Sequence, residues 1–107
     1  MKHKKSKATD IPQKVKKKVW ERDGMRCKMC GNPTAMPNAH YIPRSSGGLG
    51  IEENVVTMCA ECHHEYDNGS KRDIYKEEIK EYLISKYPDW NEEDLVYDKF
   101  HWLKGVV

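Results

Sequence analysis

The sequence contains no long apolar run. Its 107 residues are 34% charged and have a mean hydropathy of -0.93, and no stretch approaches the roughly 20 apolar residues of a transmembrane helix. The basic start, residues 1–7, is not followed by the apolar segment of about 7–15 residues that marks a secretory signal. We therefore expect a cytoplasmic protein that makes no contact with a membrane.

Apolar residues are also scarce. At 37% apolar content, the chain can form one small domain, but its many charges leave little apolar surface to bury. Small domains of this kind commonly depend on a bound metal or on disulfides. We expect a metal to stabilise the fold.

The charge is divided unevenly along the chain. Residues 1–28 contain 11 Lys and Arg against 3 Asp and Glu, a balance of +8, whereas residues 29–107 contain 8 against 14, a balance of -6. Such a basic arm is suited to a phosphate backbone, because each neutralised phosphate releases counterions. The alternative is a solubilising tail or a localisation signal.

A basic helix is predicted near the N-terminus. Residues 1–9 are expected to be a disordered basic tail, and Asp10 is predicted to cap a helix that has Pro12 in its first turn and runs through Trp20. This helix would turn its cations outward, toward solvent or DNA. The candidate DNA contacts on it are Lys14, Lys17 and Lys18.

Two Cys-x-x-Cys pairs bracket the middle of the chain: Cys27 with Cys30, and Cys59 with Cys62. Each pair can place two thiolates about 4 Å apart on one metal, so the two pairs together predict a closed four-cysteine zinc site. The alternatives are two disulfides or four unrelated buried thiols. The insert at 31–58 is longer than the roughly 15–20 residues of a compact zinc ribbon, and we expect it to carry the function.

The insert and its flanks predict a hairpin followed by a helix. Residues 38–42 are predicted as a short strand stopped by Pro43, residues 44–50 as a glycine-rich loop, and residues 54–58 as a β-branched strand. A helix should follow the second cysteine pair and end near Gly69.

The segment beyond Gly69 predicts two scaffold helices. Apolar residues at helical spacing between Asp73 and Tyr87 predict the first, which Pro88 terminates. A capping pattern at 91–94 predicts the start of the second. Aromatic residues on both are expected to pack in the core or against a partner: Tyr75, Tyr82, Tyr87, Trp90, Tyr97, Phe100 and Trp102.

Within the cysteine frame, Asn54 follows His40 by 14 residues and His63 follows it by 23. With Pro43 and the Gly47-Gly48 turn, this segment resembles an HNH nuclease of the four-cysteine type over about residues 14–69. The resemblance implies an α+β fold: a small ββα-metal, treble-clef-like core, preceded by the basic helix and followed by two helices. Small free-standing HNH proteins of phage and prophage are similar.

The resemblance also implies domain boundaries and roles. The nuclease core with its zinc knuckles would span 10–69, and a helical extension, 70–107, would pack on the same domain. His40 would be the general base on water, and Asn54 would orient it through the loop backbone. One divalent cation, Mg2+, Mn2+ or another, would be bound partly by His63. Arg44, which lies just past His40, is a candidate phosphate contact.

One position departs from the family pattern. The residue before His40, usually a metal-binding Asp or His in this family, is Ala39. Asp67 lies four residues after His63 on the same predicted helix face, and its carboxylate oxygen can replace the metal ligand that is missing at Ala39. His64 and Asn38 are weaker candidates.

The function that this pattern favours is a metal-dependent endonuclease that nicks or cuts double-stranded DNA with little sequence preference. The alternative is a zinc-stabilised DNA- or protein-binding module without catalysis. A third hypothesis is an accessory role in phage packaging beside a terminase. Residue-level alternatives also stay open: His63 or His64 as a zinc ligand, His40 as a structural histidine, Asn54 as a plain strand-start residue, and Asp67 as an ordinary helix-end residue.

Overall fold

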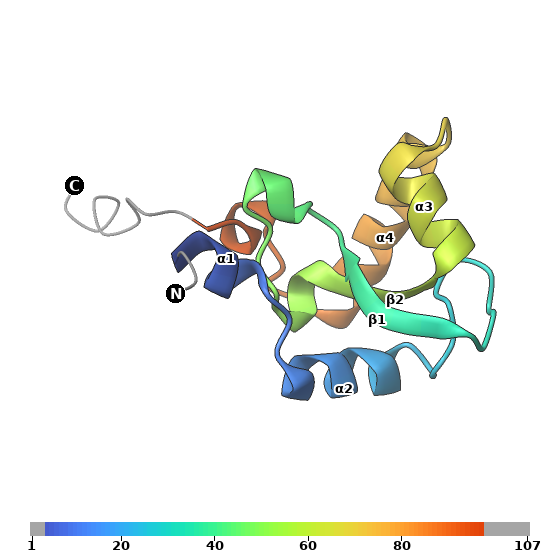
Figure 1. Ribbon diagram of the computed structural model, residues 1–107, viewed down its shortest axis with the longest axis horizontal. Coiled ribbons are helices and arrows are strands. Elements are labelled where there is room, and N and C mark those ends of the chain that lie inside the picture. Colours follow the sequence, from blue (N-terminus) through green and yellow to red (C-terminus); the bar gives the residue numbers. More distant parts are fainter. Residues whose placement is uncertain (1–3, 98–107) are drawn as a thin grey trace.

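The computed structural model describes residues 4–97 (Figure 1). Its helices and strands are α1 (Lys4–Thr9), α2 (Gln13–Arg22), β1 (Ala35–His40), β2 (Val55–Cys59), α3 (Ala60–Asn68) and α4 (Arg72–Lys86). Three short 3-10 turns are η1 (Arg44–Ser46), η2 (Glu52–Asn54) and η3 (Glu92–Leu95). No helix in the described part is long and apolar enough to cross a membrane.

The centre of the fold is an antiparallel hairpin followed directly by a helix, as the ββα core predicts. Ala35 pairs with Cys59 and His40 with Val55, and the register shifts between Met36 and Ala39, where β1 carries one extra residue. Figure 1 shows α2 along one side of the hairpin, with α3 and α4 on the other. The α+β class and the hairpin–helix order are therefore confirmed, although β1 starts earlier than the predicted strand at 38–42 and ends two residues sooner.

The basic helix forms, but Asp10 does not cap it. Pro12 occupies the N-cap position of α2, with its carbonyl oxygen 3.0 Å from the Val15 nitrogen, and the Asp10 carboxylate instead contacts Arg44. Proline is suited to this helix boundary because it lacks the N–H that would have no partner there. Val19 on α2 is fully buried where this helix packs against the hairpin.

The N-terminal tail differs from the expected disorder. Lys4–Thr9 forms α1, the side chain of Thr9 is buried, and the Ala8 carbonyl accepts a hydrogen bond from the Gly50 N–H at 3.1 Å. The prediction of disorder failed because the tail is held by a backbone contact with a loop about 40 residues away. A lysine-rich composition does not predict such a contact.

A buried ion pair joins α2 to β2 and α4. The Arg22 guanidinium donates to both carboxylate oxygens of Asp23, at 2.8 and 3.1 Å, and to the Val55 carbonyl at 2.7 Å. Asp23 in turn accepts from the Thr57 N–H at 2.7 Å and from the Tyr82 hydroxyl at 2.5 Å. This network fixes the end of α2 against the hairpin.

The first predicted scaffold helix is confirmed as α4, with Ile79 and Leu83 buried. The prediction of a second scaffold helix is wrong within the described residues. The short 3-10 turn η3 ends at Leu95, and Val96 forms an antiparallel bridge with Gly48. The aromatic residues of this region pack against the core as expected: Tyr75, Tyr82, Tyr87 and Trp90. Phe100 and Trp102 lie outside the described residues.

Candidate active site and metal centre

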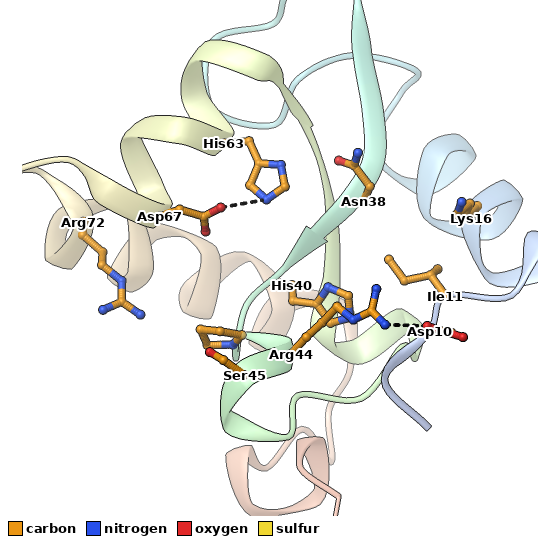
Figure 2. Close-up of a pocket in the computed structure, with 11 residues that line it drawn as sticks. Asp10, Ile11, Lys16, Asn38, His40, Arg44, Ser45, His63, Asp67 and Arg72 are labelled. Atoms are coloured by element: carbon orange, nitrogen blue, oxygen red, sulfur yellow. Dashed lines mark hydrogen bonds and ion pairs between the residues drawn. The ribbon is translucent and has the colours of Figure 1, made fainter. Parts of the chain in front are cut away.

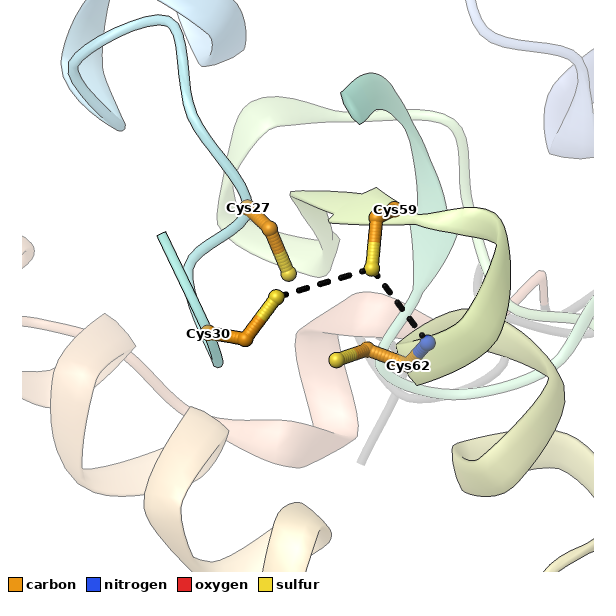
Figure 3. A group of neighbouring side chains, drawn as sticks. All are labelled: Cys27, Cys30, Cys59 and Cys62. Atoms are coloured by element: carbon orange, nitrogen blue, oxygen red, sulfur yellow. Dashed lines mark hydrogen bonds between the residues drawn. The ribbon is translucent and has the colours of Figure 1, made fainter. Parts of the chain in front are cut away.

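The four cysteines converge on one point, as predicted (Figure 3). Their sulfur atoms all lie within 4.8 Å of one another, and Cys30 and Cys59 are 3.6 Å apart at sulfur. A disulfide needs about 2.05 Å, so these are free thiols placed to form a metal site. Four thiolates in this arrangement suit tetrahedral zinc.

Local structure builds this centre from two turns. The Gly31 N–H donates to the Cys27 carbonyl at 2.8 Å, which closes the first turn, and Cys59 caps α3 by accepting from the Cys62 N–H at 3.5 Å. Burial alone would raise the pKa of the Cys27 thiol, but backbone hydrogen bonds from Cys59, Cys30 and Met29 lower it to about 7. Burial raises the pKa of Cys62, and hydrogen bonds to Cys59 and Cys30 raise it further. Burial thus opposes loss of the Cys62 proton, and a bound cation would favour the thiolate form of the cluster.

A separate open cleft of about 880 Å³ lies where the hairpin, α2, α3 and the start of α4 meet (Figure 2). Figure 2 shows His63 and Asp67 of α3 on one side, Lys16 of α2 on the other, and His40 with Arg44 between them. The titratable and amide side chains that line it are Asp10, Lys16, Asn38, His40, Arg44, His63, Asp67 and Arg72.

His40, the last residue of β1, is 9% exposed. Its Nε2 lies 2.8 Å from the Thr9 carbonyl oxygen. A carbonyl oxygen only accepts, so in the neutral ring Nε2 carries the proton and Nδ1 is left as an acceptor. Burial lowers the pKa of His40, with Arg44 acting in the same direction, although the hydrogen bond to Thr9 opposes the shift. The site therefore favours a neutral imidazole with a basic Nδ1.

Asn54 is fully buried beneath the loop that follows His40. Its side chain accepts from the Ile42 N–H at 2.8 Å and donates to the carbonyls of Ile42, at 3.2 Å, and Leu49, at 2.9 Å. Its own carbonyl accepts from the Tyr41 N–H at 2.7 Å. Asn54 thus holds the backbone on the C-terminal side of His40 without lining the cleft.

His63 and Asp67 face each other one turn apart on α3, with Nε2 and Oδ2 3.3 Å apart. No third His, Cys, Asp or Glu among residues 4–97 joins this pair in a metal-binding group. Ala39 contributes no ligand atom and is completely buried in the core. Asn38, its neighbour on β1, is exposed and lines both the cleft and an adjoining hollow together with His63 and Asp67.

The predicted cations are divided between the cleft and the outer surface. Arg44 lines the cleft and lies 2.5 Å from the Asp10 carboxylate. Lys14, Lys17 and Lys18 are exposed on α2 but do not line the cleft, and Lys18 lies 3.8 Å from Glu52.

Sequence reasoning missed two cleft cations, Lys16 and Arg72. Lys16 is half-buried, and its position three residues before the buried Val19 could have marked it as the edge of the packed face of α2. Arg72 opens α4, and no local pattern identified it. The Thr9 contact was missed as well, because a backbone carbonyl has no residue-type signature.

Comparison with known proteins supports the resemblance to HNH nucleases. The HNH endonuclease family model matches residues 27–69, which contain both cysteine pairs, His40, Asn54 and His63. The chain is also similar to Anaredoxin from Nostoc sp. (strain PCC 7120 / SAG 25.82 / UTEX 2576), with 33% identity over 66 residues that cover 60% of this chain and 87% of that protein. Comparison with solved structures gives no match. The chain therefore belongs to the HNH endonuclease family.

Proposed function

We propose that this protein is a metal-dependent endonuclease that hydrolyses phosphodiester bonds of double-stranded DNA. The observation that carries the proposal is that His40 lines one cleft with the His63–Asp67 pair and with three cations, Lys16, Arg44 and Arg72. Hydrolysis of a phosphodiester needs a base for water, stabilisation of the negative charge on phosphorus, and help for the leaving 3′ oxygen. The cleft offers a group for each need.

His40 is the proposed general base. With Nε2 engaged by the Thr9 carbonyl, Nδ1 takes a proton from the attacking water as the new P–O bond forms and the bond to the 3′ oxygen breaks. The ring is neutral when it acts, since burial lowers its pKa. Asn54 supports this role by holding the backbone at Ile42 and Tyr41, next to His40.

His63 and Asp67 are the proposed ligands of a catalytic divalent cation, which when bound would stabilise charge on the phosphate and the leaving oxygen. The amide oxygen of Asn38 would complete a three-residue set, since Asn38 lines the same two hollows as His63 and Asp67. One imidazole nitrogen and two oxygens suit Mn2+ better than Mg2+, which prefers oxygen ligands alone. We therefore expect Mn2+ to support activity more strongly than Mg2+.

The DNA backbone is the proposed partner of the cleft cations. Lys16, Arg44 and Arg72 come from three different elements and can contact phosphates around the scissile bond. The exposed lysines of α2, Lys14 and Lys17, extend the positive surface outward. Phosphate contacts carry no base information, so we expect little sequence preference. A packaging role beside a terminase stays a prediction.

A second candidate is a zinc-stabilised binding module without catalysis. The burial of Ala39 favours it, because the usual ligand position contributes nothing to the cleft. The name of the relative, Anaredoxin, does not denote a nuclease, so the activity proposed here rests on the cleft itself.

Cleavage of supercoiled plasmid by zinc-loaded protein separates the two candidates. We expect conversion to nicked or linear DNA with Mn2+, less with Mg2+, and none in EDTA at a concentration that leaves the zinc bound. DNA binding without conversion under any divalent cation would favour the binding module.

A further inference from the structure

The backbone immediately before α2 forms one wall of the cleft. We call residues 8–11 the N-terminal strap. Its Ala8 carbonyl accepts from the Gly50 N–H at 3.1 Å, and the Thr9 side chain is only 3% exposed. Asp10 and Ile11 line the cleft. The strap is thus packed into the site that the hairpin and α3 build.

At Gly50 the backbone of the glycine-rich loop lies directly against the backbone of the strap. A Cβ atom at this position would overlap the carbonyl oxygen and carbon of Asp10. Because these are backbone atoms rather than the end of a flexible side chain, they could yield only if the strap moved. Glycine at position 50 therefore permits the strap to lie where it does.

The strap contacts two of the cleft residues directly. The Thr9 carbonyl oxygen lies 2.8 Å from His40 Nε2, and the Asp10 carboxylate lies 2.5 Å from Arg44 Nη2. Arg44 is otherwise well exposed, with 53% of its side chain accessible. A long exposed arginine samples many rotamers, and a carboxylate partner reduces that freedom.

We propose that Thr9 and Asp10 are positioning residues of the active site. The Thr9 carbonyl holds His40 in the Nε2–H tautomer, which leaves Nδ1 free to accept a proton, and the Asp10 carboxylate holds Arg44 at the phosphate. Neither strap residue is a catalytic residue, because each acts through another side chain. The effect on cleavage rests on the proposed function, whereas the effect on the His40 tautomer does not.

The test displaces the strap in the full-length protein. In Gly50→Ala, the new methyl group pushes the strap away, and in Asp10→Ala the strap loses its contact with Arg44. The control is Lys7→Ala, which removes an exposed side chain of α1. Side-chain 15N NMR at about pH 8, where a histidine is neutral, reports the tautomer of His40, whose signals are assigned by their loss in His40→Ala.

We expect a single Nε2–H tautomer for His40 in the unmodified protein and in Lys7→Ala. Gly50→Ala should show a mixture of tautomers and about 10- to 100-fold slower cleavage, the scale expected when a reacting group is misplaced. Asp10→Ala should change the His40 tautomer and the cleavage rate in the same direction, but by less, because the strap loses only its contact with Arg44. If circular dichroism shows that Gly50→Ala is unfolded, Asp10→Ala is the variant that tests the proposal.

Two results would overturn the proposal: an unchanged His40 tautomer in every folded strap variant, or the Nδ1–H tautomer in the unmodified protein. The NMR result also separates the two claims. Tautomer changes in a protein that never cleaves DNA would support the strap and refute the nuclease. DNA cleavage with no change of the His40 tautomer in the strap variants would support the nuclease and refute the role of the strap.

Discussion

His63 Nε2 and Asp67 Oδ2 lie 3.3 Å apart across one turn of α3, inside the cleft that His40 also lines. Two side chains so placed can share one cation. We predict that Asp67→Asn weakens Mn2+ binding by about tenfold or more, because it removes the only carboxylate of the proposed ligand set. Isothermal titration of zinc-loaded protein measures this directly.

Glu61→Gln is the matched control for Asp67→Asn. Glu61 is an exposed carboxylate on the same helix that does not line the cleft, so its neutralisation should leave Mn2+ binding unchanged. Equal Mn2+ affinities in the unmodified protein, Asp67→Asn and Glu61→Gln would mean that the cation binds elsewhere.

The four-cysteine cluster should be required for the fold. Cys27, Cys59 and Cys62 are buried where β2 meets α3, and removal of a structural zinc commonly unfolds a small domain. We predict one zinc per chain by elemental analysis and loss of cooperative thermal unfolding after chelation or in Cys62→Ser. A protein that keeps its unfolding transition without metal would contradict this role.

Arg22 should stabilise the domain more than any exposed arginine. Its guanidinium bonds Asp23, the Glu52 and Val55 carbonyls and the Tyr87 hydroxyl, and its side chain is only 11% exposed. Arg22→Ala leaves Asp23 buried without its charged partner, so we predict a loss of about 3 kcal/mol in unfolding free energy. Urea titration should show a change within about 0.5 kcal/mol for the exposed control Arg26→Ala. Similar losses in both variants would refute the special role of Arg22.

Acidification should act on His40 in a defined direction. Burial lowers its pKa from the usual 6.5, so the folded protein binds this proton more weakly than the unfolded chain. The stabilising contribution is complete above about pH 6.5 and is lost as the pH falls through the lower folded-state pKa. Urea titrations across this range should show a steeper loss of stability for the unmodified protein than for His40→Gln.

The same shift sets the pH profile of cleavage. Because His40 stays neutral below the pH at which an exposed histidine becomes charged, the acidic limb of the rate profile should lie below pH 6.5. An acidic limb at or above that value would mean that another group, or a differently placed His40, limits the reaction.

The parts of this protein that the sequence predicted are those with a local signature. The two Cys-x-x-Cys pairs indicated the metal site because the ligand spacing is set by single turns, and the helical spacing between Asp73 and Tyr87 indicated α4. His40 and His63 could be assigned to one site because a hairpin and the helix after it have few ways to pack.

The parts that escaped prediction depend on distant backbone contacts. Thr9 reaches His40 through its carbonyl, and the bridge between Gly48 and Val96 replaces the predicted start of a second C-terminal helix. Arg22 looked like one of many basic residues, yet its partners lie up to 65 positions away. None of these contacts leaves a periodic pattern in the sequence.

The most direct test compares single-turnover plasmid cleavage and DNA affinity in the unmodified protein and in His40→Ala, with His64→Ala as the exposed control outside the cleft. If His40 is the general base, His40→Ala should cleave about 100- to 10,000-fold more slowly while its DNA affinity changes less than threefold, and His64→Ala should match the unmodified protein. Equal cleavage rates with and without the His40 imidazole would contradict the account.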